Sequence, residues 1–147
     1  MPKMIFVNFP VRDLARSQAF YEALGGQLNP QFSDERAKCV MLSDLIGVML
    51  LTHERYAEFS QRPIGDARRE SQTLIALSED SREAVEATVK RAAAAGGQAD
   101  PNPVIDYGFM LNRSVEDPDG YVWEIMWMDM AAAQAGCQDA APAVETA

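Results

Sequence analysis

The 147-residue sequence predicts an α+β fold built from two similar modules, each a strand, a helix and three further strands. Both halves contain an apolar run, then a capped helical pattern, then Gly-Gly-Gln, at 25–27 and 96–98. This repetition indicates an internal duplication with modules at about 4–60 and 71–128. Two such sheets facing each other can enclose a cup.

The first module begins with an apolar run at 4–9, typical of a buried strand. Asp13 is a suitable N-cap, and apolar residues then recur at helical spacing until Gly25-Gly26. Further strands are expected at 27–32, 37–42 and 45–52. A more polar connection follows from 53 to 70, in which 55–60 has the pattern of a helical turn.

The second module repeats this order. Asp80-Ser81 is a capping signal for an alanine-rich helix at 82–95. Its strands and extended segments are expected at 72–77, 99–106, 109–115 and 121–127. We expect one domain at 1–130, because residues 131–147 are mostly small or polar and are predicted to be disordered.

One stretch near the end of the second module combines a turn with an isolated carboxylate. In Asp117-Pro118-Asp119-Gly120, proline fixes φ, Asp119 can hydrogen-bond its own backbone and Gly120 accepts a positive φ, which predicts a hairpin. The aromatic and β-branched strand that follows carries Glu124 in its middle. Because a buried, unpaired carboxylate is costly, Glu124 either faces a cavity or ligand, forms a structural ion pair or occupies an exposed edge.

Composition narrows the possible functions. The net charge of −9 argues against nucleic-acid binding, which needs a basic face, but permits a cationic ligand. His53 is the only histidine, so a metal site built from several imidazoles is excluded. Cys39 and Cys137 have no metal-binding or disulfide spacing. With no membrane-length apolar run and no signal-peptide pattern, we expect a soluble cytoplasmic protein with no membrane partner.

The chain resembles the glyoxalase/bleomycin-resistance/dioxygenase family, also called the vicinal oxygen chelate family. The resemblance rests on the duplication, on Val11-Arg12-Asp13-Leu14 with Ser17 and Phe20-Tyr21, and on the segment from Glu116 to Glu124. It covers about residues 4–128 and is lactoylglutathione-lyase-like. It implies that two βαβββ modules form an open eight-stranded cup, and that the protein forms a homodimer.

In metal-dependent members of that family, four strands each supply a His, Gln or Glu ligand. The resemblance places the last of these positions on Glu124 and the others on Phe6, Leu74 and, with less certain register, Leu50. Hydrocarbon side chains cannot hold a divalent ion, so we predict no metal and no other cofactor. His53 lies just beyond Leu50 and can at most add a second, weak ligand to Glu124.

Strand alternation predicts a mainly apolar cup face. Its expected members are Phe6, Asn8, Leu50, Thr52, Leu74, Ala76, Val122, Glu124 and Met126. Tyr107 and Phe109 form either a lip of this pocket or a packed hairpin edge. The alternative is that the apolar side chains fill the cup and that nothing binds.

Two function classes are compatible with these residues. The favoured one is a small-molecule-binding protein that sequesters or senses its ligand in the apolar cup; an acidic chain suits a cationic ligand. The other is a lyase or isomerase of the lactoylglutathione-lyase type, in which Glu124 is the catalytic general base. That reaction would need Arg113 or His53 to stabilise the enolate.

Overall fold

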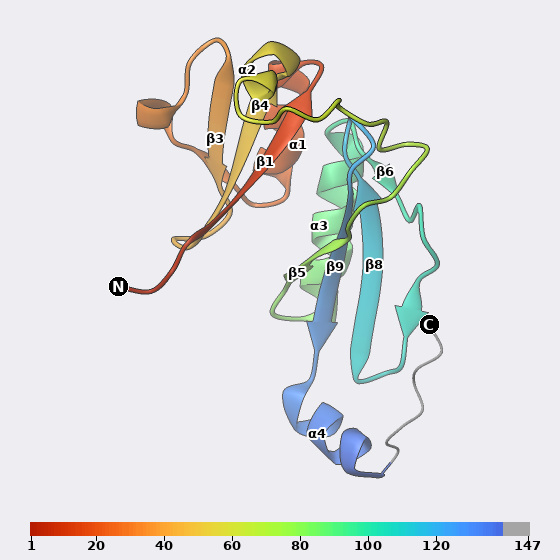
Figure 1. The fold of residues 1–147 in the computed structure, drawn as a ribbon. Coiled ribbons are helices and arrows are strands. Elements are labelled where there is room, and N and C mark those ends of the chain that lie inside the picture. Colours follow the sequence, from red (N-terminus) through yellow and green to blue (C-terminus); the bar gives the residue numbers. More distant parts are fainter. Residues whose placement is uncertain (140–147) are drawn as a thin grey trace.

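The computed structural model describes residues 1–139, which form two mixed sheets with helices packed between them (Figure 1). In the first half the elements are β1 (Ile5–Val11), α1 (Leu14–Ala23), β2 (Gln27–Leu28), the 3₁₀ helix η1 (Pro30–Phe32), β3 (Ala37–Met41), β4 (Ile46–Thr52) and α2 (His53–Ala57). The strand order is β1-β4-β3-β2, and β1 runs parallel to β4 while the other neighbours are antiparallel.

The second half repeats this plan. Its elements are β5 (Ile75–Ser78), α3 (Arg82–Ala94), β6 (Gln98–Ala99), β7 (Ile105–Asp106), β8 (Met110–Glu116), β9 (Val122–Met128) and α4 (Met130–Asp139). The order is β5-β9-β8-β6, with β7 also on β8, and β5 is parallel to β9 just as β1 is parallel to β4. The predicted α+β fold is confirmed as two open sheets of four and five strands.

The paired glycines that follow α1 and α3 have the same two roles in both modules. Gly25 and Gly96 have φ of +109° and +103°, a conformation that favours glycine after a helix. The following glycines lie against neighbours that leave no space for a side chain: a Cβ on Gly26 would come within 2.4 Å of Val40, and one on Gly97 within 2.6 Å of Phe20. The Gly-Gly-Gln repeat is therefore a helix stop followed by a close approach between a helix and a strand.

Three local predictions need correction. The expected strand at 27–32 is only β2, because Asn29 caps Gln31 and starts η1. The extended segment at 99–106 is interrupted and contributes only the short β6 and β7. The prediction of disorder from residue 131 is wrong for 131–139, which belong to α4, while 140–147 lie outside the described residues.

A shared core joins the two modules. The α1 side chains Phe20 and Tyr21 and the α3 side chains Val85 and Val89 are fully or almost fully buried in one cluster with core residues of both sheets. Aromatic rings make the contact between the modules, since Phe9 on β1 stacks on Tyr121 at 4.5 Å between ring centroids. We call the face of each sheet turned away from α1 and α3 its open face.

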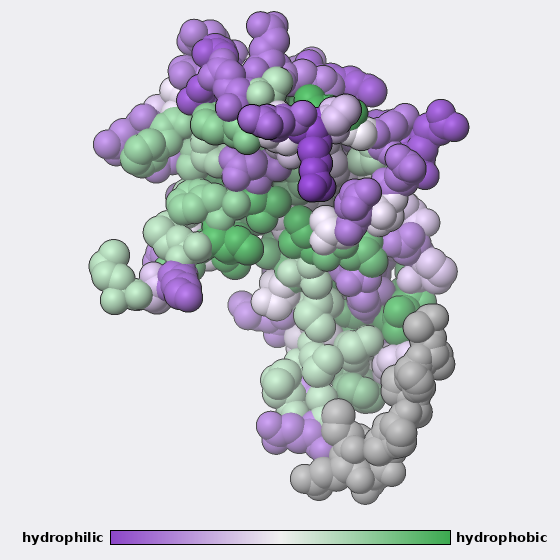
Figure 2. Space-filling view, in the orientation of Figure 1, coloured by the Kyte–Doolittle hydropathy of each residue, from purple (hydrophilic) through white to green (hydrophobic). Residues whose placement is uncertain are grey.

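The two sheets meet at this aromatic contact and diverge from it, leaving β1 and β5 as neighbouring edges that pair only with strands of their own sheet (Figure 1). Apolar residues gather where the sheets diverge, below a more hydrophilic top (Figure 2). Ile5, Phe6 and Leu74 on or next to these edges are 57%, 46% and 50% exposed. Such a patch on an isolated chain points to a binding surface.

Among the described helices, none has the length and apolar character needed to cross a membrane.

Candidate functional site

The turn between β8 and β9 is a buried polar contact between the modules. Asp117 is 2% exposed, and its Oδ1 accepts hydrogen bonds from the backbone N–H groups of Asp119 and Tyr121, both at 2.9 Å. Its Oδ2 accepts from the Tyr21 hydroxyl on α1 at 2.6 Å, and the Trp123 indole donates to that same hydroxyl at 3.0 Å. These bonds fix the turn to the first helix.

The hydrogen bonds of the two aspartates in this turn differ from the sequence prediction. Asp117, rather than Asp119, makes the backbone contacts within the turn. The carboxylate of Asp119 instead accepts from the backbone N–H of Arg12 at 3.0 Å and from Ser17 Oγ at 3.2 Å. The predicted hairpin is confirmed, with Gly120 at a φ of +100°. Both carboxylates therefore hold the first module to the second.

Burial dominates the electrostatics at this turn. Desolvation raises the pKa of Asp117 to about 6, although its hydrogen bonds from Tyr21 and the backbone oppose the rise. Desolvation also raises the pKa of Tyr21 well above its ordinary value, and the nearby Asp117 carboxylate raises it further. Neither group is accessible, so this pair is structural.

Glu124 lies on the open face of the second sheet. Ala76 on β5 and Ser114 on β8 are its register partners, and the side chain is half-buried. Its hydrogen bond comes from Asn112 Nδ2, at 3.3 Å. Among residues 1–139, no ion pair to Glu124 is formed.

Asn112 is a site residue that the sequence analysis missed. Its Nδ2 faces Glu124, while its Oδ1 is buried and has no hydrogen-bond partner among the described residues. A buried acceptor without a donor is costly, so this oxygen marks a place for a further donor. The hairpin register could have revealed it, because Asn112 stands opposite Met126 and diagonal to Glu124.

Arg113 does not belong to this face. It pairs in register with the core residue Ile125, so its side chain lies on the helix side of β8. There its Nε donates to Asp100 Oδ1 at 3.0 Å, and its guanidinium also pairs with Glu86 on α3. Arg113 therefore lies on the opposite side of the sheet from Glu124, which contradicts its predicted role in stabilising an enolate there.

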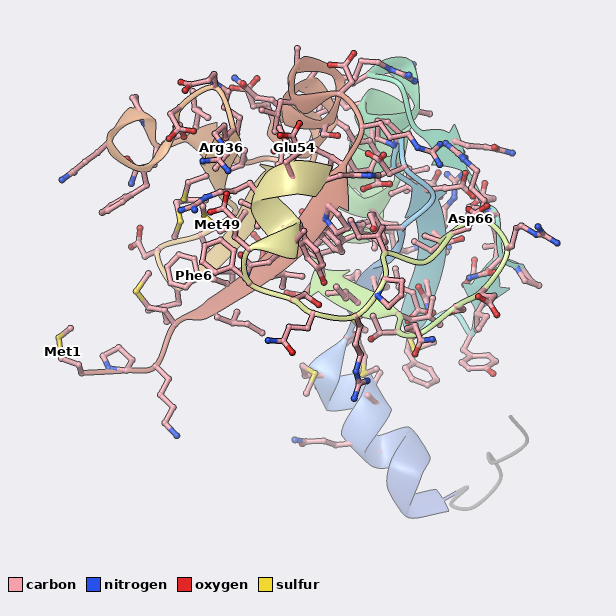
Figure 3. All side chains as sticks on the ribbon, turned by 45° about the horizontal axis from the view of Figure 1, so that its top comes forward. Met1, Phe6, Arg36, Met49, Glu54 and Asp66 are labelled. Atoms are coloured by element: carbon pink, nitrogen blue, oxygen red, sulfur yellow. The ribbon has the colours of Figure 1, made fainter. Side chains whose placement is uncertain are left out.

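The open face of the first sheet contains a pocket of about 340 Å³. Its floor comes from β1, β3 and β4, and its walls come from η1, α2 and the residues after them. Phe6 and Met49 lie on the same side of this sheet (Figure 3), as the pairing of Asn8 with Met49 requires. The lining residues are Asn8, Gln31, Phe32, Ser33, Asp34, Ala37, Met49, Leu51, Arg55 and Phe59.

Two residues predicted for the cup face point the other way. Leu50 pairs with Phe9 and is fully buried in the core between sheet and helices. Thr52 pairs with the core residue Val11, and its hydroxyl caps α2 by accepting from the N–H of Arg55 at 3.2 Å. Because β4 is apolar on both faces, its sequence has no alternation that fixes which residues face the core.

The other predicted residues are spread over the molecule. Leu74 precedes β5 and is half-exposed, and Met126 lies beside Asn112 on the open face of the second sheet. His53 is exposed at the start of α2 and is outside the pocket lining. Tyr107 and Phe109 stack on each other, 6.2 Å between centroids, at the tip of the β7–β8 hairpin, also outside that lining. Glu124 and Asn8 thus lie on open faces of different sheets.

The family resemblance assigns four positions to metal ligands, and the side chains at these positions do not match such ligands. Phe6 and Leu74 are hydrocarbon, Leu50 is in the core, and only Glu124 offers an oxygen. In the part of the chain that the structure describes, no three His, Cys, Asp or Glu side chains are grouped so that they could hold a metal. These four side chains therefore do not form a ligand set for a divalent ion.

Comparison with known proteins fits this architecture. The family model described as the Glyoxalase/Bleomycin resistance protein/Dioxygenase superfamily matches residues 3–125. The chain belongs to this superfamily. No curated protein gives a significant sequence match.

Several solved structures share the fold. A hypothetical protein from S. aureus aligns with a TM-score of 0.70 and 25% identity over 86% of this chain and 95% of its own. A glyoxalase-related enzyme from Fulvimarina pelagi gives 0.71 and 22% over 86% and 88%. The bleomycin resistance determinant encoded on transposon Tn5 gives 0.58 and 18% over 87% and 99%. The superfamily thus contains both enzymes and resistance proteins.

Proposed function

We propose that this superfamily member binds a small organic molecule on its open faces and does so without a metal. The pocket of about 340 Å³ carries the proposal, because Ala37, Met49 and Leu51 give its floor an apolar part, while five of its ten lining residues supply polar groups. Its size falls in the usual range for small-ligand sites, roughly 300–1,000 Å³, which are largely apolar with a few polar groups. The family's metal-ligand position Phe6 lies on this same face.

A second feature favours a ligand that carries N–H donors or a positive charge. Glu124 and the unpaired Asn112 Oδ1 are neighbouring acceptors on the open face of the second sheet. An ammonium or amidinium group would supply a charge and donors to the half-buried Glu124 carboxylate, beside which the Asn112 amide lies. The net charge of −9 adds a long-range attraction for cations.

We also propose a homodimer formed through the diverging edges. β1 and β5 are unpaired edges, and Ile5, Phe6 and Leu74 beside them are half-exposed. A second copy would cover both the backbone edges and the apolar side chains. Light scattering at tens of micromolar protein tests this directly, and a monomer mass would contradict it. A cytoplasmic location stays a prediction from the sequence.

The alternative is a lyase or isomerase in which Glu124 removes a proton next to a carbonyl. Its support is the carboxylate on an open, partly apolar face. Arg113 lies on the other side of the sheet from Glu124, and among residues 1–139 His53 makes no hydrogen bond or ion pair with Glu124. Ligand binding therefore explains more of the observed geometry.

A fragment screen by ligand-observed NMR tests the binding function. We expect hits on the wild-type protein that are lost in Met49→Lys, because this substitution places an ammonium on the apolar floor. Leu45→Lys is the matched control, since it removes a half-exposed apolar residue outside the pocket lining. Hits that survive Met49→Lys, or the absence of any hit, would overturn the proposal.

Elemental analysis of protein purified without a tag tests the metal-free part. We expect no stoichiometric Zn²⁺, Ni²⁺ or Fe²⁺. About one metal per chain that is lost in Glu124→Ala would contradict this expectation.

A further inference from the structure

Two exposed phenylalanines form walls of the pocket on the first sheet. Phe32 ends η1 and Phe59 follows α2, and both side chains line the same cavity. They are 61% and 67% exposed, which leaves much of each ring in water. Single exposed apolar residues need no explanation, but two large rings at one pocket indicate a surface shaped for a ligand.

The segment that carries Phe32 is fixed by local hydrogen bonds. The Asn29 side chain accepts from the N–H of Gln31 at 3.0 Å, and the N–H of Phe32 donates to the Asn29 carbonyl at 3.2 Å. Ser33 Oγ donates to the same carbonyl at 2.7 Å and accepts from the N–H of Cys39 on β3 at 2.9 Å. This wall is therefore attached to the sheet that forms the floor.

The second wall, which carries Phe59, is also held by local contacts. The N–H of Phe59 donates to the Tyr56 carbonyl at 2.9 Å, and the Arg55 guanidinium lies 4.6 Å from the ring centroid. Arg55 is in turn paired with Glu58 at 2.5 Å. A ring held by a fixed cation loses less freedom when a ligand binds, which favours affinity.

The floor and rim determine what else the ligand needs. Met49 and Leu51 present apolar surface. Among the described residues the exposed Asn8 amide makes one hydrogen bond, 3.4 Å from its Nδ2 to the Phe6 carbonyl, so its Oδ1 is open to a donor. At the rim, Glu58 pairs with both Arg55 and Arg36. With the Asp34 carboxylate, which also lines the pocket, the rim carries two carboxylates and two arginines, so its formal charges balance and add no strong preference for charge.

We propose that this pocket takes a planar aromatic ring system, about the size of two fused rings, stacked against Phe32 and Phe59. A ligand hydroxyl or N–H would donate to Asn8 Oδ1. This inference rests on the proposed binding function and deepens it by naming the ligand class. Aromatic rings gain from stacked or edge contacts beyond simple apolar burial, so planarity, rather than hydrophobicity alone, decides recognition.

Two probes of nearly equal size separate planarity from hydrophobicity: 2-naphthol, which is flat, and decahydro-2-naphthol, which is saturated and thick. Both carry one hydroxyl and are neutral at pH 7. We expect 2-naphthol to bind at least about five times more tightly in titrations followed by amide chemical shifts, with the largest shifts around Met49. Equal affinity, or tighter binding of the saturated probe, would overturn the inference.

Substitutions of the walls supply the second test. Phe32→Leu and Phe59→Leu keep an exposed apolar side chain, and each should weaken 2-naphthol binding about three- to tenfold, because an aromatic contact is lost. Tyr107→Leu is the matched control, since Tyr107 is 65% exposed and outside the pocket lining. Unchanged affinity in both wall variants would overturn the inference.

The outcomes distinguish this inference from the function on which it rests. If neither naphthol binds but other fragments bind in a Met49-dependent manner, the aromatic ligand class is wrong and the binding function stands. If no fragment depends on Met49, the binding function itself fails, and this inference fails with it.

Discussion

Two carboxylates on the last hairpin, Asp117 and Glu124, have opposite surroundings. Asp117 is 2% exposed, accepts three hydrogen bonds and connects both modules. Glu124 is half-buried on an open face, and its partner is the Asn112 amide at 3.3 Å. A carboxylate that is fully hydrogen-bonded in the core supports the fold, whereas one with few partners at a surface is available to a ligand. Substitutions of both carboxylates, and of Ser17 beside the turn, test this distinction.

The largest expected effect is that of Asp117→Ala. The Tyr21 hydroxyl and two backbone N–H groups would lose their acceptor in the interior, at a cost of about 3 kcal/mol or more in the free energy of unfolding. Urea unfolding of the variant and the wild type measures this loss. Asp44→Ala, in an exposed turn, is the control and should change stability by less than about 0.5 kcal/mol. Equal losses at both positions would contradict a special role for Asp117.

The next effect is a pH dependence that belongs to Asp117. Its pKa is about 6 in the folded protein against 3.8 for the free group, so the folded state keeps a proton that the unfolded chain releases. This contribution is fully present below pH 4 and is lost as the pH rises through 6. At about 1.4 kcal/mol per pKa unit, the loss is about 3 kcal/mol.

Comparison with Asp117→Asn isolates this contribution, because the amide keeps the shape but does not titrate. Urea unfolding at several pH values should show wild-type stability falling relative to the variant between pH 4 and 7. Parallel curves for the two proteins would mean that the pKa of Asp117 is not raised.

A smaller effect is expected for Ser17→Ala, beside the same turn. Ser17 is fully buried on α1, and its hydroxyl donates to Asp119 Oδ2 at 3.2 Å. Asp119 keeps its bond from the N–H of Arg12 and remains near water, so the loss should be about 1 kcal/mol. Chemical denaturation checks the value. A loss as large as that of Asp117→Ala would show that the two aspartates act as one unit.

The sequence predicted the parts of the fold that depend on local chemistry. Asp13 and Ser81 cap the two long helices as expected, and Gly120 takes the positive φ of the predicted hairpin. These features involve backbone groups a few residues away, so the residue types alone indicate them. The duplication was visible for the same reason, because both helices end at the same pair of glycines.

The candidate site was less predictable, because its geometry depends on partners distant in sequence. Leu50 and Thr52 were assigned to the wrong face, since β4 is apolar on both sides. Arg113 was assigned to the cup because its acidic partners on α3 and after β6 could not be seen. Phe32 and Phe59 line the pocket only through η1 and α2, whose positions over the sheet no local pattern specifies.

The smallest effect on stability is expected for Glu124→Gln. Glu124 has no ion pair among the described residues, and glutamine can still accept from Asn112 Nδ2, so the melting temperature should change by no more than about 2 °C or should rise. The control is Glu83→Gln, which removes one negative charge from an exposed position on α3.

The same pair of variants tests whether the Glu124 charge serves a ligand. Benzamidine carries a cationic amidinium with four N–H donors, and neutral benzamide is its matched probe. If the Glu124 carboxylate is an acceptor for a ligand, benzamidine should shift the resonances of the neighbouring Asn112 side chain in wild-type protein and in Glu83→Gln, with benzamide binding more weakly. Its affinity should fall about fivefold or more in Glu124→Gln, because the charge-assisted bond becomes a neutral one. A large loss of stability with unchanged benzamidine binding would instead show that Glu124, like Asp117, stabilises the fold and does not bind a ligand.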